Sequence, residues 1–387
     1  MTACATKTAA ASGTARRSGF SIAADGSYAA CLTQGASPPT GSVHDTGWYP
    51  ERWTLSGPEP YTVPLPGRQP EAVDAQVLPL PDGRVLIRRR SADRHDLALL
   101  YPTGPGTGEL PVGFLHGESV RLLPALPCGT AYALGYANGR STVWLVHGGP
   151  GLEQRAEIDG RCTGGVWLDR AGRLLALDRE HEGRTKTIAV DLCTGATSPL
   201  LQITEESDDR LLLADPDSKL LLVRSNAPGT HRLGWGVLDS RRPVRFPDCL
   251  REPGGSDAAT PSAPQIEPLA IQPGQLLMPE SCAVVLRIGR RAVLWRPSAR
   301  GLWPLPTPPG WLVGSAWWSA DGTLRLPYAR PEQPYGVRDI TSAALSDPVP
   351  RATRTPGPAV GAPSVPRPMT PVSRVLPLRQ APLAGVR

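Results

Sequence analysis

The residues with the clearest chemical potential are a His-Gly-Gly-Pro-Gly run at positions 147–151. Backbone N–H groups of a glycine-rich turn can converge on the oxyanion that forms during acyl transfer. Such chemistry also needs a serine nucleophile in a G-x-S-x-G turn, followed by an acid and a histidine. No serine completes that turn. Several have Gly two residues before them but lack Gly two residues after, among them Ser37, Ser119, Ser141 and Ser256.

This run resembles the oxyanion segment of proline-iminopeptidase-like α/β-hydrolases, which implies an esterase or peptidase site around His147. The sequence that follows does not support that implication. Only His181 and His231 remain downstream, and no alternation of strands and helices follows. We therefore interpret residues 143–146 as a strand and residues 147–151 as its hairpin loop.

Other polar clusters have plain structural interpretations. His181-Glu182 begins like a zinc-binding H-E-x-x-H motif, but Thr185 stands where the second His is needed. Ser207-Asp208-Asp209 and the pair Asp215 and Asp217 lack the ligand series of a calcium loop. Five tryptophans gather near the C-terminal part, and we expect them to form core rather than a ligand site: Trp295, Trp303, Trp311, Trp317 and Trp318. We predict no catalytic, cofactor-binding or metal-binding residues.

The charge of the chain is unevenly distributed. The net charge is +6, and residues 351–387 contain six Arg and no acid. The rest of the chain is balanced, with 35 basic and 35 acidic groups. A basic face on a folded domain would favour nucleic acid, whereas a diffuse tail does so only weakly. We therefore do not expect a nucleic-acid partner. A nucleic-acid binder that uses this basic tail is kept as an alternative, behind the two hypotheses given at the end of this section.

Composition limits the class of protein. The chain has 40% apolar residues, which is enough for a core, and 45 Pro with 41 Gly, which favours short elements and turns over long helices. No apolar run is long enough to span a membrane, and residues 1–18 lack the apolar region of a secretory signal. Seven scattered Cys without C-x-x-C predict reduced thiols in a cytoplasmic protein. Only three of 41 basic residues are Lys, which is typical of GC-rich, for example actinobacterial, genomes.

A recurring turn organises these elements. A short turn, often ending in Asp-Gly, lies between apolar runs at seven places, 43 to 57 residues apart: Gly26, Gly83, Gly129, Gly172, Ser218, Gly274 and Gly322. Asp-Gly supplies the positive φ of a tight hairpin, so the flanking runs should pair as antiparallel strands. The spacing is close to that of a four-stranded propeller blade. In the fourth unit we expect strands at 165–168, 174–178, 187–192 and 197–203, with a polar loop at 179–184.

We therefore predict an all-β fold, a seven-bladed β-propeller, with six or eight blades and a β-sandwich as alternatives. The predicted domains are a flexible N-terminus at 1–17, the propeller at 18–345 and a disordered, Pro- and Arg-rich tail or linker at 346–387. Residues 251–265 should form a polar loop between blades. The sequence leaves open whether the first strand, near Phe20, completes the last blade or the blades meet without strand exchange.

The repeated units resemble the N-terminal propeller of prolyl-oligopeptidase-family serine peptidases, in the dipeptidyl- and acylaminoacyl-peptidase-like branch. The resemblance is carried by the turns at 24–26, 81–83 and 319–322 and by the Pro-rich exit at 331–338. Similar turns are typical of TolB-like and WD40-like propellers. In the peptidase family, the propeller covers a C-terminal α/β-hydrolase domain and restricts access to small peptides. Here the sequence stops at Arg387, about where that domain would begin, and no triad residue can be carried over.

Our leading hypothesis is a non-catalytic propeller that binds a peptide or protein partner, with an α/β-hydrolase among the candidates and no cofactor. The competing hypothesis is a split or truncated serine peptidase that acts on small peptides, completed by a partner that supplies the hydrolase domain. A hydrolase with its site in the propeller funnel belongs to the same alternative.

Overall fold

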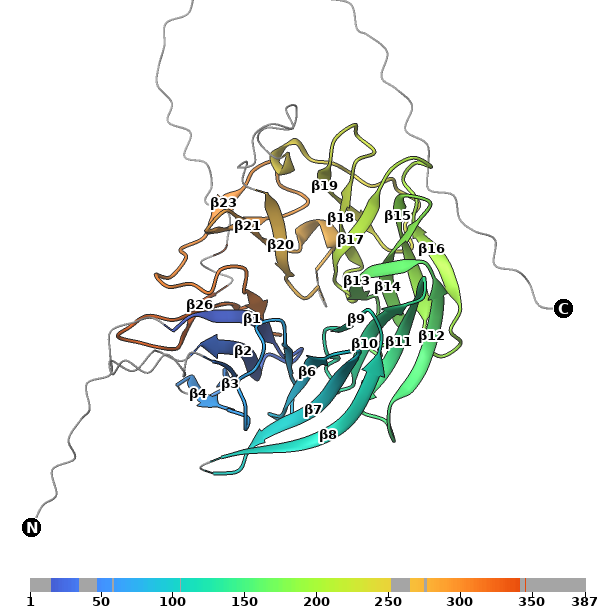
Figure 1. Ribbon diagram of the computed structural model, residues 1–387. Helices are drawn as coiled ribbons and strands as arrows, with labels where there is room; N and C mark the ends of the chain where they lie inside the picture. Colours follow the sequence, from blue (N-terminus) through green and yellow to red (C-terminus); the bar gives the residue numbers. More distant parts are fainter. Residues whose placement is uncertain are drawn as a thin grey trace, which may run out of the picture.

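The computed structural model describes residues 15–34, 47–57, 59–104, 106–251, 265–274, 277–341 and 345. Its regular elements are β-strands, apart from two three-residue 3-10 helices, η1 (Asp248–Leu250) and η2 (Pro279–Ser281). The strands form seven separate antiparallel sheets, which Figure 1 shows arranged around a common centre. The predicted all-β, seven-bladed propeller is confirmed, and six blades, eight blades or a sandwich do not describe it.

Blades 1 to 4 each contain four strands, which cross the sheet in chain order. Blade 1 consists of β1 (Arg17–Ile22), β2 (Tyr28–Gln34), β3 (Trp48–Thr54) and β4 (Tyr61–Pro64). Blade 2 consists of β5 (Gln76–Pro79), β6 (Val85–Ser91), β7 (Arg94–Pro102) and β8 (Thr107–His116). Blade 3 consists of β9 (Ser119–Leu122), β10 (Ala131–Ala137), β11 (Arg140–His147) and β12 (Glu153–Asp159). Blade 4 consists of β13 (Arg161–Trp167), β14 (Leu174–His181), β15 (Arg184–Asp191) and β16 (Thr197–Leu201).

The last three blades are less regular. Blade 5 consists of β17 (Asp209–Ala214), β18 (Leu220–Ser225) and β19 (Arg232–Val237), and a single bridge from Trp235 to Arg245 takes the place of the fourth strand. Blade 6 consists of β20 (Ile266–Ile271), β21 (Val284–Ile288), β22 (Arg291–Trp295) and β23 (Trp303–Pro304). Blade 7 consists of β24 (Trp317–Trp318), β25 (Leu324–Tyr328) and β26 (Gly336–Ile340).

The recurring turn lies in the same place in every blade, between the first and second strands. Gly26 and Gly83 have φ of 73° and 83°, a region that costs residues with a Cβ more than glycine. Asp25 and Asp82 accept hydrogen bonds from the backbone N–H two residues later, which fixes the turn. In blade 5, where Ser218 holds the marker position, Lys219 adopts the positive φ of 62°.

The four strands of the fourth unit overlap their predicted ranges, but the prediction of a polar loop at 179–184 is wrong. β14 continues to His181 and β15 begins at Arg184, so only Glu182 and Gly183 connect them, both at positive φ. Such a two-residue turn matches the twist of the flanking strands. The end of β14 and the start of β15 carry polar side chains because they lie at the exposed end of the blade. Their composition is therefore like that of a loop.

Apolar side chains fill the space between neighbouring blades. Seven clusters of buried residues lie among the described elements, one at each contact between successive sheets around the ring. The cluster between blades 7 and 1 holds five buried residues: Ala29, Cys31, Trp53, Leu55 and Ala329. Three of these are small, so Trp53, which is fully buried, supplies much of the contact area.

The ring closes without strand exchange among the described residues. β1 pairs with β2 of its own sheet, and β26 pairs with β25. Figure 1 shows β26 beside β1 and β2, where the two ends of the ring meet. Side-chain packing holds this seam, including an edge-on contact of Phe20 with Trp53 at 5.2 Å between ring centroids. The question that the sequence left open is thus resolved in favour of blades that meet without a shared strand.

Two buried carboxylates link strands and blades. Glu51 Oε2 accepts hydrogen bonds from Arg17 Nε at 3.0 Å, Thr33 Oγ1 at 2.9 Å and Trp53 Nε1 at 3.1 Å. Asp209, which has no exposed surface, is bound at 2.8 Å by Lys186 Nζ from the preceding blade. Its other donors are the hydroxyls of Ser207 and Ser225 and the backbone N–H of Ile203. A buried carboxylate is stable only with such a complete set of partners.

Three predicted segments fall largely or wholly outside the described residues. They are the flexible N-terminus at 1–17, of which only 15–17 are described, the polar loop at 251–265 and the tail at 346–387. Leu345, the last described residue, is buried against blades 6 and 7.

Candidate functional site

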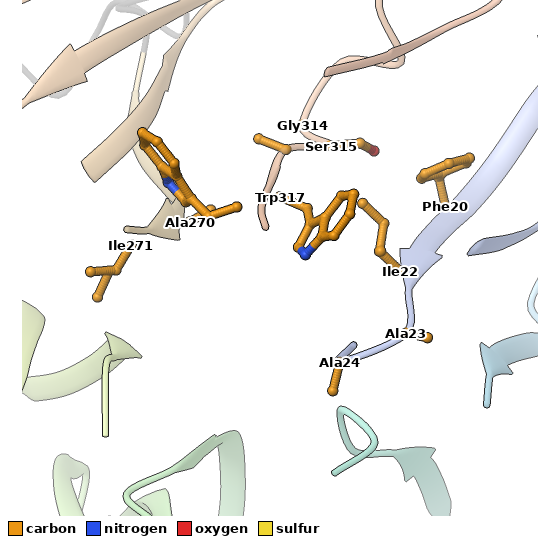
Figure 2. A pocket seen from close by; sticks show the side chains of 11 residues that line it. Phe20, Ile22, Ala23, Ala24, Ala270, Ile271, Gly314, Ser315 and Trp317 are labelled. Atoms are coloured by element: carbon orange, nitrogen blue, oxygen red, sulfur yellow. The ribbon is translucent and has the colours of Figure 1, made fainter. Parts of the chain in front are cut away.

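A cavity of about 320 Å³ lies where blades 1, 6 and 7 meet. Its walls come from β1 and the turn after it, from the end of β20, and from the segment 314–318 that leads into β24. Figure 2 shows Phe20 and Ile22 facing Trp317, with Ala270 and Ile271 on the other side of that ring. A cavity of this volume lies at the lower end of the range for sites that hold small molecules or single side chains.

The local sequence of blade 1 shapes one wall. The pairing of β1 with β2 shifts between Ser18 and Ser21, and Gly19 in this bulge has φ of 65°. A bulge re-aims the side chains beside it. Phe20 lies within the bulge, packs edge-on against Trp53 and lines the cavity.

The turn between β1 and β2 of blade 1 contacts Trp317, which forms another wall of the cavity. A Cβ built on Gly26 would lie 1.7 Å from Cζ2 of Trp317. The Trp317 ring therefore rests directly on the backbone of this turn, and only glycine permits that approach. The guanidinium of Arg325 lies 4.8 Å from the centre of the Trp317 ring, which adds a cation–π contact. These contacts hold the indole at the cavity wall.

The polar surface of the cavity belongs to backbone groups and uncharged side chains. No Asp, Glu, Lys, Arg or His lines it. Trp318 is 5% exposed, and its Nε1 is a buried donor without a hydrogen-bond partner among the described residues. The Ser315 side chain adds a hydroxyl at the wall. The site therefore suits a neutral, apolar group, because no charged side chain of the lining would stabilise an ionic one.

Sequence reasoning assigned these tryptophans only to the core. Trp295, Trp311 and Trp318 are indeed buried, which confirms that part of the prediction. Trp317 and Trp318 also form a cavity wall, which the prediction missed. The available signal was the pair Trp317-Trp318 placed directly before the turn at 319–322 in the last blade.

The His-Gly-Gly-Pro-Gly run lies elsewhere, in blade 3. β11 ends at His147, and residues 148–152 connect it to β12, as the hairpin interpretation predicts. His147 Nε2 lies 3.4 Å from Arg84 Nη2 of blade 2. Burial and the Arg84 charge lower the pKa of His147. No serine hydroxyl is bonded to this imidazole among the described residues.

The acidic candidates have structural roles. Asp178 is buried in β14 and accepts hydrogen bonds from Thr187 Oγ1 and the Leu211 N–H, which connect blade 4 to blade 5. Burial raises the pKa of Asp178, and these two donors partly offset that effect. Asp215 accepts bonds from Ser218 and from the Gly274 N–H of blade 6. Within the described ranges, no three His, Cys, Asp or Glu residues converge as a metal site would require.

The thiols of the described residues are free: Cys31, Cys128, Cys162, Cys193, Cys249 and Cys282. Burial raises the pKa of Cys31 to about 12, and the nearby Glu51 carboxylate acts in the same direction. A thiol of this kind packs as a small apolar group and is chemically inert.

Comparison with known proteins identifies the fold. No protein-family model matches the sequence. No curated protein matches it in sequence either. Among solved structures, a mutant of puromycin hydrolase complexed with PGG matches with a TM-score of 0.51 and 16% identity, over 86% of this chain and 53% of that one. This chain has the propeller fold of prolyl-oligopeptidase-family peptidases.

Two further solved structures match this propeller with lower scores. A puromycin-hydrolyzing peptidase of Mycobacterium tuberculosis matches with a TM-score of 0.49 and 14% identity, over 85% of this chain and 52% of that one. A putative TolB from Agrobacterium tumefaciens matches with a TM-score of 0.40 and 15% identity, over 72% of this chain and 94% of that one. The chain spans about half the length of the two peptidases.

In the described ranges, no helix has the length and apolar character needed to cross a bilayer.

Proposed function

We propose that this peptidase-type propeller is a non-catalytic binding module, and that the cavity between blades 1, 6 and 7 takes an apolar side chain of a peptide or protein partner. The observation that carries the proposal is the lining of the cavity, which consists of apolar side chains together with Ser315 and contains no charged side chain. An apolar side chain of a partner would fill a cavity of this kind. We further propose a cytoplasmic location, because the cysteines of the described residues are free thiols.

Binding can be measured by calorimetric titration with N-acetyl-phenylalanine amide, which offers an apolar ring and two carbonyl acceptors. We expect saturable binding that Ala24→Trp weakens by at least about tenfold, since Ala24 is exposed at the cavity and a large ring there obstructs it. Ala171→Trp is the matched control, because Ala171 is exposed at the corresponding turn of blade 4. Equal affinity in the two variants, or no binding to the wild-type protein, would show that the cavity is not the site.

A second candidate is the gating half of a two-chain serine peptidase, as the sequence suggested. It is favoured by the fold match to just over half of the puromycin hydrolase chain. In that case the partner is an α/β-hydrolase subunit that supplies the nucleophile.

An assay of the purified chain for hydrolytic activity distinguishes these two proposals from an enzyme whose site was not recognised. We expect the purified protein to leave aminoacyl and peptidyl p-nitroanilides intact and to take no label from a fluorophosphonate probe. Hydrolysis together with probe attachment to one serine would overturn the non-catalytic assignment. Hydrolysis that arises only after an α/β-hydrolase subunit is added would favour the two-chain peptidase.

A further inference from the structure

A second cavity, of about 410 Å³, lies on blade 4 and has a different character. Its walls are formed by β14, β15 and β16 and by Gln202 and Glu205, which follow β16. Blade 4 lies across the ring from the seam between blades 7 and 1 in Figure 1. This cavity is therefore independent of the one assigned to an apolar side chain.

Basic residues face one another across two strands of this cavity. Arg179 in β14 is directly opposite Lys186 in β15, and His181 is opposite Arg184. All four residues line the cavity. Like charges directly opposite one another on a sheet destabilise it unless an anion compensates them. The arrangement thus raises the question of which anion balances each cation.

Lys186 is balanced inside the protein. Its ammonium binds Asp209 at 2.8 Å and also donates to the hydroxyl of Ser207. It therefore serves the contact between blades 4 and 5, and it is not a free ligand group.

The two arginines lack such compensation. Arg184 Nη1 donates to the backbone carbonyl of Glu206, which carries no charge. Arg179 has a buried Nε without a hydrogen-bond partner and forms no ion pair among the described residues. Glu182 and Glu205 line the cavity, but both are exposed, and Glu182 is nearest to His181 at 3.8 Å.

We propose that this cavity binds the phosphate group of a small phosphorylated molecule, held by Arg179 and Arg184. The two arginines are diagonal neighbours on adjacent strands, a separation that long side chains can bridge. Planar guanidinium groups form paired, charge-assisted hydrogen bonds with phosphate oxygens. Thr197 on β16 also lines the cavity, is paired with Val190 on the face of β15 that carries Arg184, and adds a hydroxyl donor. Its volume exceeds that of a phosphate ion, so it has room for an organic part of the ligand.

The test is a calorimetric titration of the full chain with inorganic phosphate and with glycerol 3-phosphate, at low ionic strength. We expect both to bind, and Arg179→Gln and Arg184→Gln each to weaken binding by about tenfold. Glu182→Gln should tighten binding by about two- to fivefold, because it removes a carboxylate that opposes the anion. Arg140→Gln is the matched control: Arg140 is an exposed arginine on blade 3, paired with Glu157 and Asp159, and its loss should leave affinity unchanged.

The variants also distinguish binding from folding. Glu182 is 85% exposed in its side chain, so Glu182→Gln should fold normally even if Arg179→Gln does not. Tighter binding of glycerol 3-phosphate than of inorganic phosphate would support recognition of an organic part, and equal binding would support recognition of the phosphate alone. The proposal is overturned if neither compound binds at millimolar concentration, or if the arginine variants bind as well as the Arg140 control.

Discussion

Replacing Asp209 with alanine should destabilise the protein by about 3–5 kcal/mol, since a buried ion pair broken on one side leaves an uncompensated charge. The carboxylate has no exposed surface, and the ammonium of Lys186 depends on it at 2.8 Å. The hydroxyls of Ser207 and Ser225 and the N–H of Ile203 lose their acceptor as well. Urea unfolding, followed by tryptophan fluorescence and circular dichroism, measures the change in the free energy of unfolding.

Asp239→Ala is the control for this substitution. Asp239 also pairs with a lysine, Lys219, at 2.7 Å, but its side chain is 70% exposed. Exposed ion pairs contribute little, so its loss should cost less than about 1 kcal/mol. Equal stability of the two variants would mean that burial of Asp209 does not determine its contribution. The double variant Asp209→Ala/Lys186→Met should recover part of the lost stability, because it removes the orphaned ammonium.

Substitution of Gly26 by alanine should have the second large effect, a loss of about 2–5 kcal/mol. Two costs combine: a φ of 73° that disfavours any residue with a Cβ, and a Cβ placed 1.7 Å from Trp317 Cζ2. Trp317 must move, and with it the wall of the cavity between blades 1, 6 and 7. We therefore expect lower stability together with weaker binding of N-acetyl-phenylalanine amide.

Gly183→Ala separates the two costs. Gly183 has nearly the same φ, 74°, but a Cβ there meets nothing within 4 Å. This variant should lose only about 1–2 kcal/mol, the cost of the backbone conformation. The difference between the two variants measures the Trp317 contact. If both lose the same stability and both keep ligand affinity, Trp317 does not depend on the turn at Gly26.

The fold was predictable because its signal is local and repeated. Each Asp-Gly turn specifies a hairpin by the backbone conformation that it requires, and recurrence at blade spacing excludes most other architectures. The loop expected at 179–184 was wrong for a related reason. Polar residues at the exposed end of a strand have the composition of a loop, and only the pairing of Arg179 with Lys186 reveals the strand.

The candidate sites were less predictable, because each depends on distant residues. Phe20, Ala270 and Trp317 come from three blades and meet only when the ring closes. Composition predicts that a tryptophan is buried, but it does not tell a core position from a cavity wall. The basic pair at Arg179 and Arg184 is visible in the sequence. That neither arginine forms an ion pair with a carboxylate among the described residues follows only from the contacts in the structure.

Because side chains close the ring, the number of blades can change without breaking a sheet. Since blades 1 and 7 share no strand within the described residues, a duplicated or deleted blade at either end would leave the backbone pairing of the remaining sheets unchanged. The number of blades then depends on the side chains packed between adjacent sheets, such as Trp53 at the seam between blades 7 and 1.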